Sequence, residues 1–192
     1  MVLVSFYSLS EEERIQLTEA AIRDGGTLRS RWEALADGEA KPWTARSARA
    51  AELLGPVESV LDVGCGTMGL EPLLQTQRYV PSDVVARDER TIVRDYNREG
   101  PPPVQVEAVA VLGVLEYLLD PEGFMRQLQA DKAVVTYCTT DSPSPLEPRR
   151  SHAWVNDMDT ATVEQMFARA GWTIRSDEQL DGAQRIWLLT RT

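Results

Sequence analysis

The chain has 192 residues, of which 43% are hydrophobic, and a formal net charge of −10 from 20 basic and 30 acidic side chains. This size fits one ordinary domain with a substantial core, and this apolar content makes extensive disorder unexpected. The acidic balance disfavours a broad nucleic-acid interface and binding to anionic membranes, because both need clustered lysine and arginine. It does not identify a substrate.

The N-terminus and the cysteines lead us to expect a reduced, cytoplasmic protein. Residues 1–14 lack the basic start and apolar stretch of a secretory signal, and no apolar run is long enough to span a bilayer. Cys65 and Cys138 do not have metal-ligand spacing and offer no disulfide framework. Since the chain has a single histidine, a multi-histidine metal centre is excluded, and we expect no metal.

The first part of the chain is expected to be helical. Ser10 followed by Glu13 forms a capping-box pattern at the start of one helix. Two further helices are expected at about residues 28–36 and 43–54. We assign residues 1–56 to an N-terminal helical cap or lid within a single compact domain.

From residue 57 onward, short apolar runs alternate with helical stretches. Strands are expected at residues 58–64, 78–84, 91–97, 107–112 and 132–138, helices at 69–76, 119–130 and 159–171, and a hairpin at 172–192. Such alternation favours a parallel sheet covered on both faces, to which the hairpin adds antiparallel strands. We therefore predict an α/β fold with a doubly wound, mostly parallel sheet of the seven-stranded type, a closing antiparallel hairpin and N-terminal helices. We expect this sheet and its helices to span residues 57–192.

The connection between the third and fourth strands is short. About nine residues, 97–105, are too few for a helix with its turns. If the strand order reverses there, the chain crosses two strands, about 14 Å at the usual spacing. Nine extended residues reach roughly 30 Å, so we expect a bare crossover.

The loop after the first strand contains Gly64, Gly66 and Gly69 in the spacing G-x-G-x-x-G. This spacing is typical of a dinucleotide site, in which the loop opens a helix beneath a pyrophosphate. Asp62 favours another ligand, because a carboxylate at the mouth of the loop repels a pyrophosphate and attracts a cation. S-adenosylmethionine carries a sulfonium and an ammonium and no phosphate. Asp83, at the end of the second strand, suits hydrogen bonds to ribose hydroxyls of either nucleotide.

Four segments of this region carry recognisable motifs. "VLDVGCGTMG" combines an acidic residue with G-x-G, and "VLGVLEYLLDP" joins a strand to a turn. "YVPSDV" and "TIVRDYN" each place an aspartate near a strand end. Together these segments resemble class I S-adenosylmethionine-dependent methyltransferases, motif by motif over about residues 57–140. Two departures are Met68, where the family's third glycine would fall, and Tyr117, where a histidine is frequent.

The resemblance implies a site for S-adenosylmethionine, with S-adenosylhomocysteine as the product. Asp62 and Gly64 would then lie beside the methionine part. Asp83 would bind the ribose and Asp95 the adenine amino group, while residues 112–113 would form the rim near the sulfonium. The implied cofactor-binding residues are Asp62, Gly64, Cys65, Gly66, Asp83, Val84, Asp95, Tyr96, Leu112 and Gly113.

The acceptor site is expected to include the long loop after the fifth strand. Methyl transfer mainly requires alignment and exclusion of water, and it needs a base only when the acceptor proton has a high pKa. His152 in this loop is the candidate base, and Tyr117 is a second catalytic candidate. We expect Arg149 and Arg150 to attract an anionic group of a small-molecule acceptor, and Trp154 to wall the pocket.

The leading interpretation is a methyltransferase that acts on a small-molecule acceptor by O- or N-methylation through in-line transfer. One alternative is a non-catalytic protein of this fold that serves as a partner subunit, motivated by Met68 and the short helix after the glycine loop. Another is an NAD-dependent oxidoreductase, which would have to tolerate Asp62 beside a pyrophosphate. Fold alone does not name the acceptor, and the sequence leaves the oligomeric state open.

Overall fold

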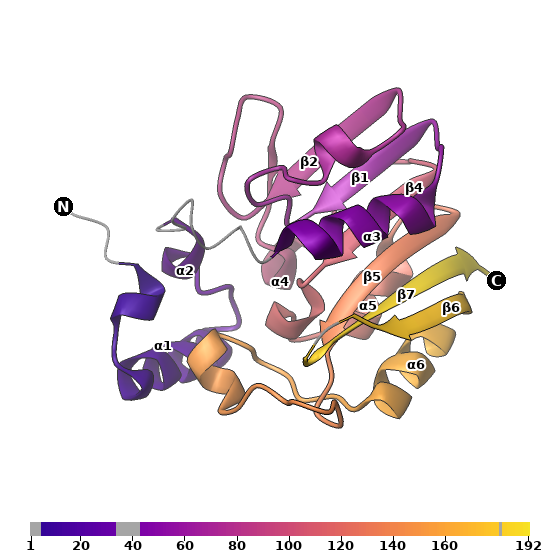
Figure 1. Ribbon diagram of the computed structural model, residues 1–192. Coiled ribbons are helices and arrows are strands. Elements are labelled where there is room, and N and C mark those ends of the chain that lie inside the picture. Colours follow the sequence, from indigo (N-terminus) through magenta and orange to yellow (C-terminus); the bar gives the residue numbers. More distant parts are fainter. Residues whose placement is uncertain (1–4, 34–42, 181) are drawn as a thin grey trace.

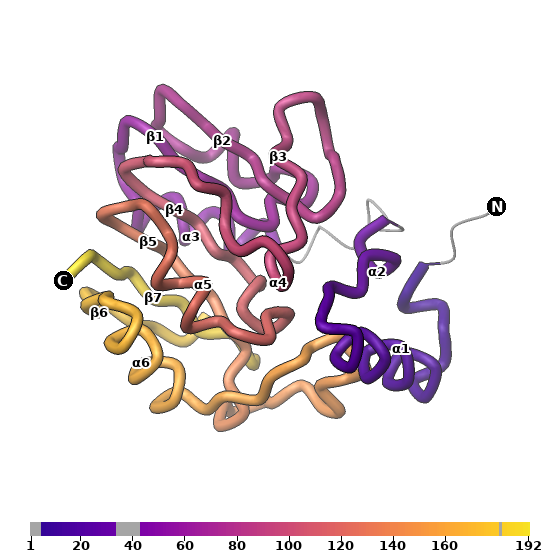
Figure 2. Tube along the Cα trace, turned by 180° about the vertical axis from the view of Figure 1, so that it is seen from behind, coloured from indigo at the N-terminus to yellow at the C-terminus, as the bar shows by residue number. Residues whose placement is uncertain are grey.

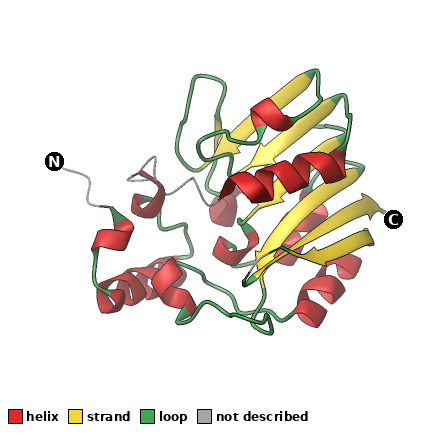
Figure 3. Ribbon diagram, in the orientation of Figure 1, coloured by secondary structure: helices red, strands yellow, loops and turns green. Residues whose placement is uncertain are grey.

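A seven-stranded sheet with the order β3-β2-β1-β4-β5-β7-β6 forms the centre of the computed structural model, which describes residues 5–33, 43–180 and 182–192 (Figure 1, Figure 3). The first five strands run parallel, and β7 and β6 are antiparallel. This confirms the doubly wound, mostly parallel sheet with a closing hairpin. The strands are β1 (Ser59–Val63), β2 (Arg78–Asp83), β3 (Ile92–Val93), β4 (Ala108–Leu112), β5 (Lys132–Cys138), β6 (Trp172–Gln179) and β7 (Gln184–Arg191).

The central strands are apolar because both of their faces are covered. Every residue of β4 is buried, and so are six of the seven residues of β5. In β4 the side chains alternate: Ala108 and Ala110 pack beneath one helical layer, whereas Val109 and Val111 pack beneath the other. In β1 the buried carboxylate of Asp62 interrupts this apolar pattern, although burying a charged group costs free energy.

Two helical layers cover the sheet. α3 (Thr44–Leu54) packs on one face through Ala50 and Leu54, and α5 (Pro121–Gln127) and α6 (Thr160–Arg169) pack on the other (Figure 1). Asp120 and Asp159 cap α5 and α6 through hydrogen bonds from Gly123 and Thr162 amides, respectively. None of the helices that the structure describes is long and apolar enough to cross a membrane.

The N-terminal helices α1 (Glu11–Asp24) and α2 (Ser30–Glu33) lie beside the sheet, at the end where the parallel strands finish (Figure 1, Figure 2). The predicted capping box is confirmed, because Ser10 Oγ accepts a hydrogen bond from the Glu13 amide and the Glu13 carboxylate accepts one from the Ser10 amide. Residues 34–36 of the predicted second helix lie outside the described residues. Because α1 and α2 lie at this end of the sheet, they face the strand ends at which ligands bind in such folds.

The connection from β3 to β4 differs from the predicted bare crossover, because it contains the one-turn helix α4 (Tyr96–Glu99). β3 ends already at Val93, so the chain leaves the sheet early enough to form a turn. The Asp95 carboxylate caps this turn by accepting a hydrogen bond from the Asn97 amide at 3.1 Å. Residues 100–107 then complete the crossing to β4.

The glycine loop after β1 adopts left-handed backbone conformations. Gly64 and Gly66 have φ of 67° and 50°, and Met68 has φ of 57°. Met68 thus takes, with a side chain, the conformation that favours glycine, at a cost of roughly 1–2 kcal/mol. A short 3-10 helix, Glu71–Leu73, follows where a short helix is predicted.

Replacing Met68 with glycine is therefore expected to raise the free energy of unfolding by up to about 1 kcal/mol. The matched control is Met68→Ala, which removes the same sulfur contact with Arg90 but keeps the strained Cβ. Urea unfolding at pH 7 measures both. If the glycine variant is no more stable than the alanine variant, the backbone at Met68 is not strained.

Candidate functional site

A cavity of about 730 Å³ lies at the carboxyl ends of the parallel strands, between the sheet and the N-terminal helices. A second cavity of about 240 Å³ adjoins it and shares Trp43, Arg46, Gly64, Gly66 and Leu112. The strand order reverses between β1 and β4, so the larger cavity occupies the switch point at which doubly wound sheets bind ligands. Of the predicted residues, it is lined by Gly64, Gly66, Asp83, Val84, Tyr96, Leu112, Gly113, Tyr117, His152 and Trp154.

The glycine loop forms one wall of the larger cavity and packs tightly against the residues after β4. A Cβ on Gly64 would lie 2.6 Å from Val114 Cγ2, so a side chain does not fit there. The Gly64 amide donates to Tyr96 Oη at 3.1 Å, and Tyr96 Oη donates to Ser82 Oγ at 2.9 Å. The loop backbone is thereby fixed against the neighbouring strand and leaves an open wall that a ligand can approach.

Asp83 ends β2 in the cavity wall and is only 4% exposed. One of its carboxylate oxygens accepts a hydrogen bond from the Gly66 amide at 2.9 Å, and the other accepts one from the Val85 amide at 3.1 Å. Arg87 makes longer contacts of 3.4 and 3.5 Å. A carboxylate is therefore held firmly at the position predicted to meet the ribose.

Asp62 lies behind the glycine loop, in the smaller cavity, and is 3% exposed. Its carboxylate accepts a hydrogen bond from Tyr79 Oη at 2.7 Å. Burial raises the pKa of Asp62 to about 7, against the opposing effects of Tyr79 and the Arg46 charge. The ionised form places negative charge beside the glycine loop, which favours a cationic ligand group.

Asp95 does not line either cavity, and its contact with an adenine amino group stays a prediction. Its carboxylate accepts hydrogen bonds from the Thr27 amide at 3.2 Å and the Thr27 hydroxyl at 2.6 Å, and it also caps α4. The early end of β3 explains this outcome, because Asp95 belongs to the turn rather than to a strand end. It fastens the N-terminal segment to the sheet, and Thr27 lines the cavity instead.

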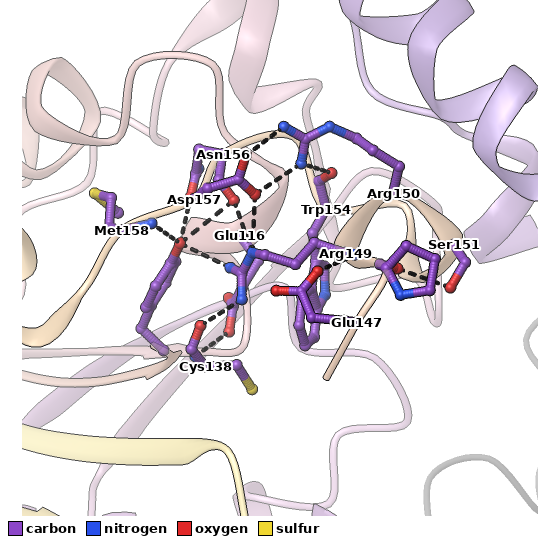
Figure 4. Close-up of polar contacts among 12 residues, drawn as sticks. Glu116, Cys138, Glu147, Arg149, Arg150, Ser151, Trp154, Asn156, Asp157 and Met158 are labelled. Carbon is purple, nitrogen blue, oxygen red and sulfur yellow. Dashed lines mark hydrogen bonds and ion pairs between the residues drawn. The ribbon is translucent and has the colours of Figure 1, made fainter. Parts of the chain in front are cut away.

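Arg149 and Arg150 do not line the cavity either, so the structure does not bring them together with the other residues predicted for the acceptor. Arg149 is 4% exposed and donates to the Cys138 carbonyl at 2.9 Å and to Tyr137 Oη at 2.8 Å (Figure 4). Asp157 pairs with both arginines, at 3.0 Å from Arg149 and 2.7 Å from Arg150. Their charge is thus used to fasten the long loop after β5 to the end of that strand.

The remaining predicted residues of the acceptor site do reach the cavity wall. The His152 ring lies 5.0 Å from Trp154 and 6.3 Å from Tyr7, measured between ring centroids. Burial and nearby arginines lower the pKa of His152, so its imidazole is neutral near pH 7. Tyr117 packs edge-on against Trp32 at 5.0 Å, and burial raises the pKa of its hydroxyl. These rings form the outer part of the cavity.

The two cysteines are buried and free. Cys65 lines the smaller cavity and Cys138 the larger one. Burial raises the pKa of both thiols, so neither is a thiolate nucleophile near neutral pH. Within residues 5–33, 43–180 and 182–192 there is no group of three or more His, Cys, Asp or Glu that could hold a metal ion.

Sequence reasoning missed three charged residues of the cavity, Arg31, Arg46 and Glu116, of which the last two bear on the proposed site. Arg46 reaches from α3 to Gly113, where its Nη1 lies 2.5 Å from the position of an added Cβ. It makes no hydrogen bond or ion pair with any residue that the structure describes, and burial lowers its pKa. The sequence "TARSARAAELL" contains a second arginine, Arg49, and only the packing of α3 shows which one faces the cavity.

Glu116 stands in the quoted segment "VLGVLEYLLDP" but has no predicted role of its own. It is 1% exposed, and its Oε1 accepts a hydrogen bond from the Cys138 amide at 2.9 Å. Its Oε2 is buried and has no partner in the described part of the chain. Burial raises the pKa of Glu116, and the Cys138 amide and the Arg46 charge oppose this shift.

Asp62→Asn is expected to stabilise the ligand-free protein more at pH 8 than at pH 5, by roughly 2 kcal/mol. Because the folded pKa lies above the ordinary value, the wild type loses stability as pH rises from about 4 to about 7, whereas asparagine does not titrate. Urea unfolding of both proteins at the two pH values measures this. An identical difference at pH 5 and pH 8 would show that Asp62 ionises freely in the folded state.

Arg149→Leu is expected to lower the free energy of unfolding by about 2–4 kcal/mol, because it removes a buried guanidinium and leaves its partners unpaired. Arg150→Leu is the matched control, since Arg150 shares the partner Asp157 but its side chain is 27% exposed. The control should lose about 1 kcal/mol or less. Equal losses in thermal or urea unfolding would show that Arg149 does not anchor the loop.

Comparison with known proteins agrees with this geometry. Residues 35–177 match the model of a family described as "Methyltransferase domain". No curated protein matches the chain.

Solved structures share the fold. They include Burkholderia thailandensis 1,6-didemethyltoxoflavin-N1-methyltransferase (14% identity, 95% of this chain and 90% of that chain, TM-score 0.62). Mitomycin 7-O-methyltransferase MmcR is similar as well (14% identity, 97% of this chain and 70% of that chain, TM-score 0.61). A third is the O-methyltransferase NcsB1 from neocarzinostatin biosynthesis, in complex with S-adenosylmethionine and 2-hydroxy-5-methyl naphthoic acid (13% identity, 95% of this chain and 69% of that chain, TM-score 0.59). The chain belongs to the methyltransferase-domain family and has the fold of class I S-adenosylmethionine-dependent methyltransferases.

Proposed function

We propose that the chain binds S-adenosylmethionine in the larger cavity and transfers its methyl group to a small-molecule acceptor by O- or N-methylation. The observation that carries this proposal is the distribution of charge around the glycine loop. Asp62 and Arg46 flank the loop with opposite charges, and Asp83 stands at the end of the next strand. This arrangement suits a ligand with an amino-acid zwitterion at one end and a ribose at the other.

Arg46 is the group that would meet the methionine carboxylate. Its guanidinium lies over Gly113 without a hydrogen-bonding partner among the described residues, so it is available to an incoming anion. Asp62 would favour the positive charge of the ammonium from the smaller cavity. The missing side chains of Gly64 and Gly113 provide the space through which the backbone and Arg46 approach the ligand.

Asp83 would accept the ribose hydroxyls, and Val84 would contact the adenine. Both residues line the cavity beyond the glycine loop, on the side of β2. The Asp95 carboxylate accepts hydrogen bonds from Thr27 and does not line this cavity. When bound, S-adenosylmethionine supplies an activated methyl group, so the chain has mainly to orient the acceptor and to exclude water.

The helices α1 and α2 would act as a lid over the acceptor, whereas α3, which the predicted cap of residues 1–56 also includes, packs on the sheet. Tyr7 and Trp32 from this segment line the cavity opposite the sheet. The Thr18 hydroxyl donates to the Arg150 carbonyl at 2.7 Å and joins α1 to the loop that carries His152 and Trp154. His152 and Tyr117 would then face the acceptor directly, with the imidazole in its neutral form.

Titration calorimetry with S-adenosylmethionine, S-adenosylhomocysteine and NAD in parallel tests the cofactor. We expect micromolar binding of the first two and no binding of NAD. Arg46→Met should weaken S-adenosylhomocysteine binding by about tenfold, the effect of losing one hydrogen bond to a charged group. It should leave the affinity for 5′-methylthioadenosine, which lacks the carboxylate, unchanged.

Equal losses for both nucleosides would remove Arg46 from the methionine site. NAD binding alone would overturn the proposal. A partner-subunit role is the second candidate, favoured by the strained Met68 in the cofactor loop. It would take precedence if none of the three ligands binds to a folded protein.

A further inference from the structure

Glu116 holds a buried carboxylate oxygen that nothing in the described part of the chain satisfies. Oε1 is held by the Cys138 amide, while Oε2 has no partner among residues 5–33, 43–180 and 182–192. Burying an unpaired polar atom is costly, and most such atoms in native proteins have a partner. Since Glu116 lines the larger cavity, a ligand in that cavity can provide the missing hydrogen-bond donor.

Glu116 lies on a different element from the two carboxylates of the proposed cofactor site. It lies in the 3-10 helix Leu115–Tyr117, directly after the chain leaves β4 at Gly113, and it is bonded to the last residue of β5. Asp62 and Asp83, by contrast, belong to β1 and β2. Glu116 therefore stands on the acceptor side of the rim at Leu112 and Gly113.

The walls of the same part of the cavity are aromatic. The centroids of the Trp32 and Tyr117 rings lie 5.0 Å apart, and His152 lies 5.0 Å from Trp154 and 6.3 Å from Tyr7. Aromatic side chains pack favourably against the faces and edges of other aromatic rings. A flat ring system is thus the acceptor shape that this lining fits.

Resting on the proposed function, we infer that the acceptor is a planar aromatic or heteroaromatic compound whose ring hydroxyl or ring N–H donates a hydrogen bond to Glu116 Oε2. During transfer, the bond between sulfur and the methyl carbon breaks with its electron pair moving to sulfur. The bond between the methyl carbon and the acceptor oxygen or nitrogen forms. The acceptor proton passes to Glu116 Oε2 and then to solvent, which makes Glu116 the base in place of His152.

The test uses three probe compounds on protein saturated with S-adenosylhomocysteine. 2-Naphthol has the flat ring and the donor, 2-methoxynaphthalene lacks the donor, and decahydro-2-naphthol lacks the aromatic ring. We expect 2-naphthol to bind at least about tenfold more tightly than either of the other two.

The variant Glu116→Gln then tests the role of the carboxylate without changing the shape of the cavity. The amide oxygen would stay on the Cys138 N–H, so the side chain would present an NH2 group, which donates but does not accept. The tenfold preference for 2-naphthol over 2-methoxynaphthalene should vanish, while the variant stays folded and keeps its affinity for S-adenosylhomocysteine. Glu122→Gln, on α5 away from the cavity, is the control that should keep the preference.

Each other outcome overturns the inference in a distinguishable way. If S-adenosylhomocysteine binds but 2-naphthol shows no preference, the acceptor class is wrong and the proposed function stands. If the preference persists in Glu116→Gln, the carboxylate does not contact the acceptor. If that variant loses affinity for S-adenosylhomocysteine, Glu116 belongs to the cofactor site. If the wild type does not bind S-adenosylhomocysteine, the inference and the proposed function fail together.

Discussion

The hydrogen bond from the Gly66 amide to the Asp83 carboxylate is the contact on which the rest of the cavity depends. It joins the loop after β1 to the end of β2, so two neighbouring strand ends and the turn between them move as one unit. Tyr96 adds a second connection by accepting from Gly64 and donating to Ser82. A buried carboxylate that accepts from backbone amides holds its geometry well, because each oxygen loses a charge-assisted hydrogen bond if it moves.

The opposite side of the cavity depends on Arg149. This buried side chain bonds to the end of β5 and to Asp157, and its guanidinium lies 4.6 Å from the centre of the Trp154 ring. The loop after β5 is therefore ordered by contacts within itself and with the strand that it leaves. α1 in turn packs on this loop through Thr18, so the position of the N-terminal segment depends on the loop that Arg149 holds.

The fold was largely predictable because its signals are local, whereas the site was predictable only in part. Strand patterns, the capping box and the glycine loop each lie within a few residues, and the structure confirms them. The roles of Asp95 and Arg149 could not be read in this way, because their partners Thr27 and Asp157 are set by three-dimensional packing. Arg46 was missed for a similar reason: whether it reaches the cavity depends on how α3 packs on the sheet.

The division of the cavity between two sets of elements has an evolutionary consequence. Asp62, Asp83 and Arg46 come from strands and a helix that also build the hydrophobic core, so moving those elements would disturb the whole domain. Apart from Tyr117 in the turn after β4, the aromatic walls come from the N-terminal segment and the loop after β5, which contribute little to the sheet. A descendant of this chain can therefore change its acceptor pocket by altering surface segments while inheriting the methyl-donor half intact.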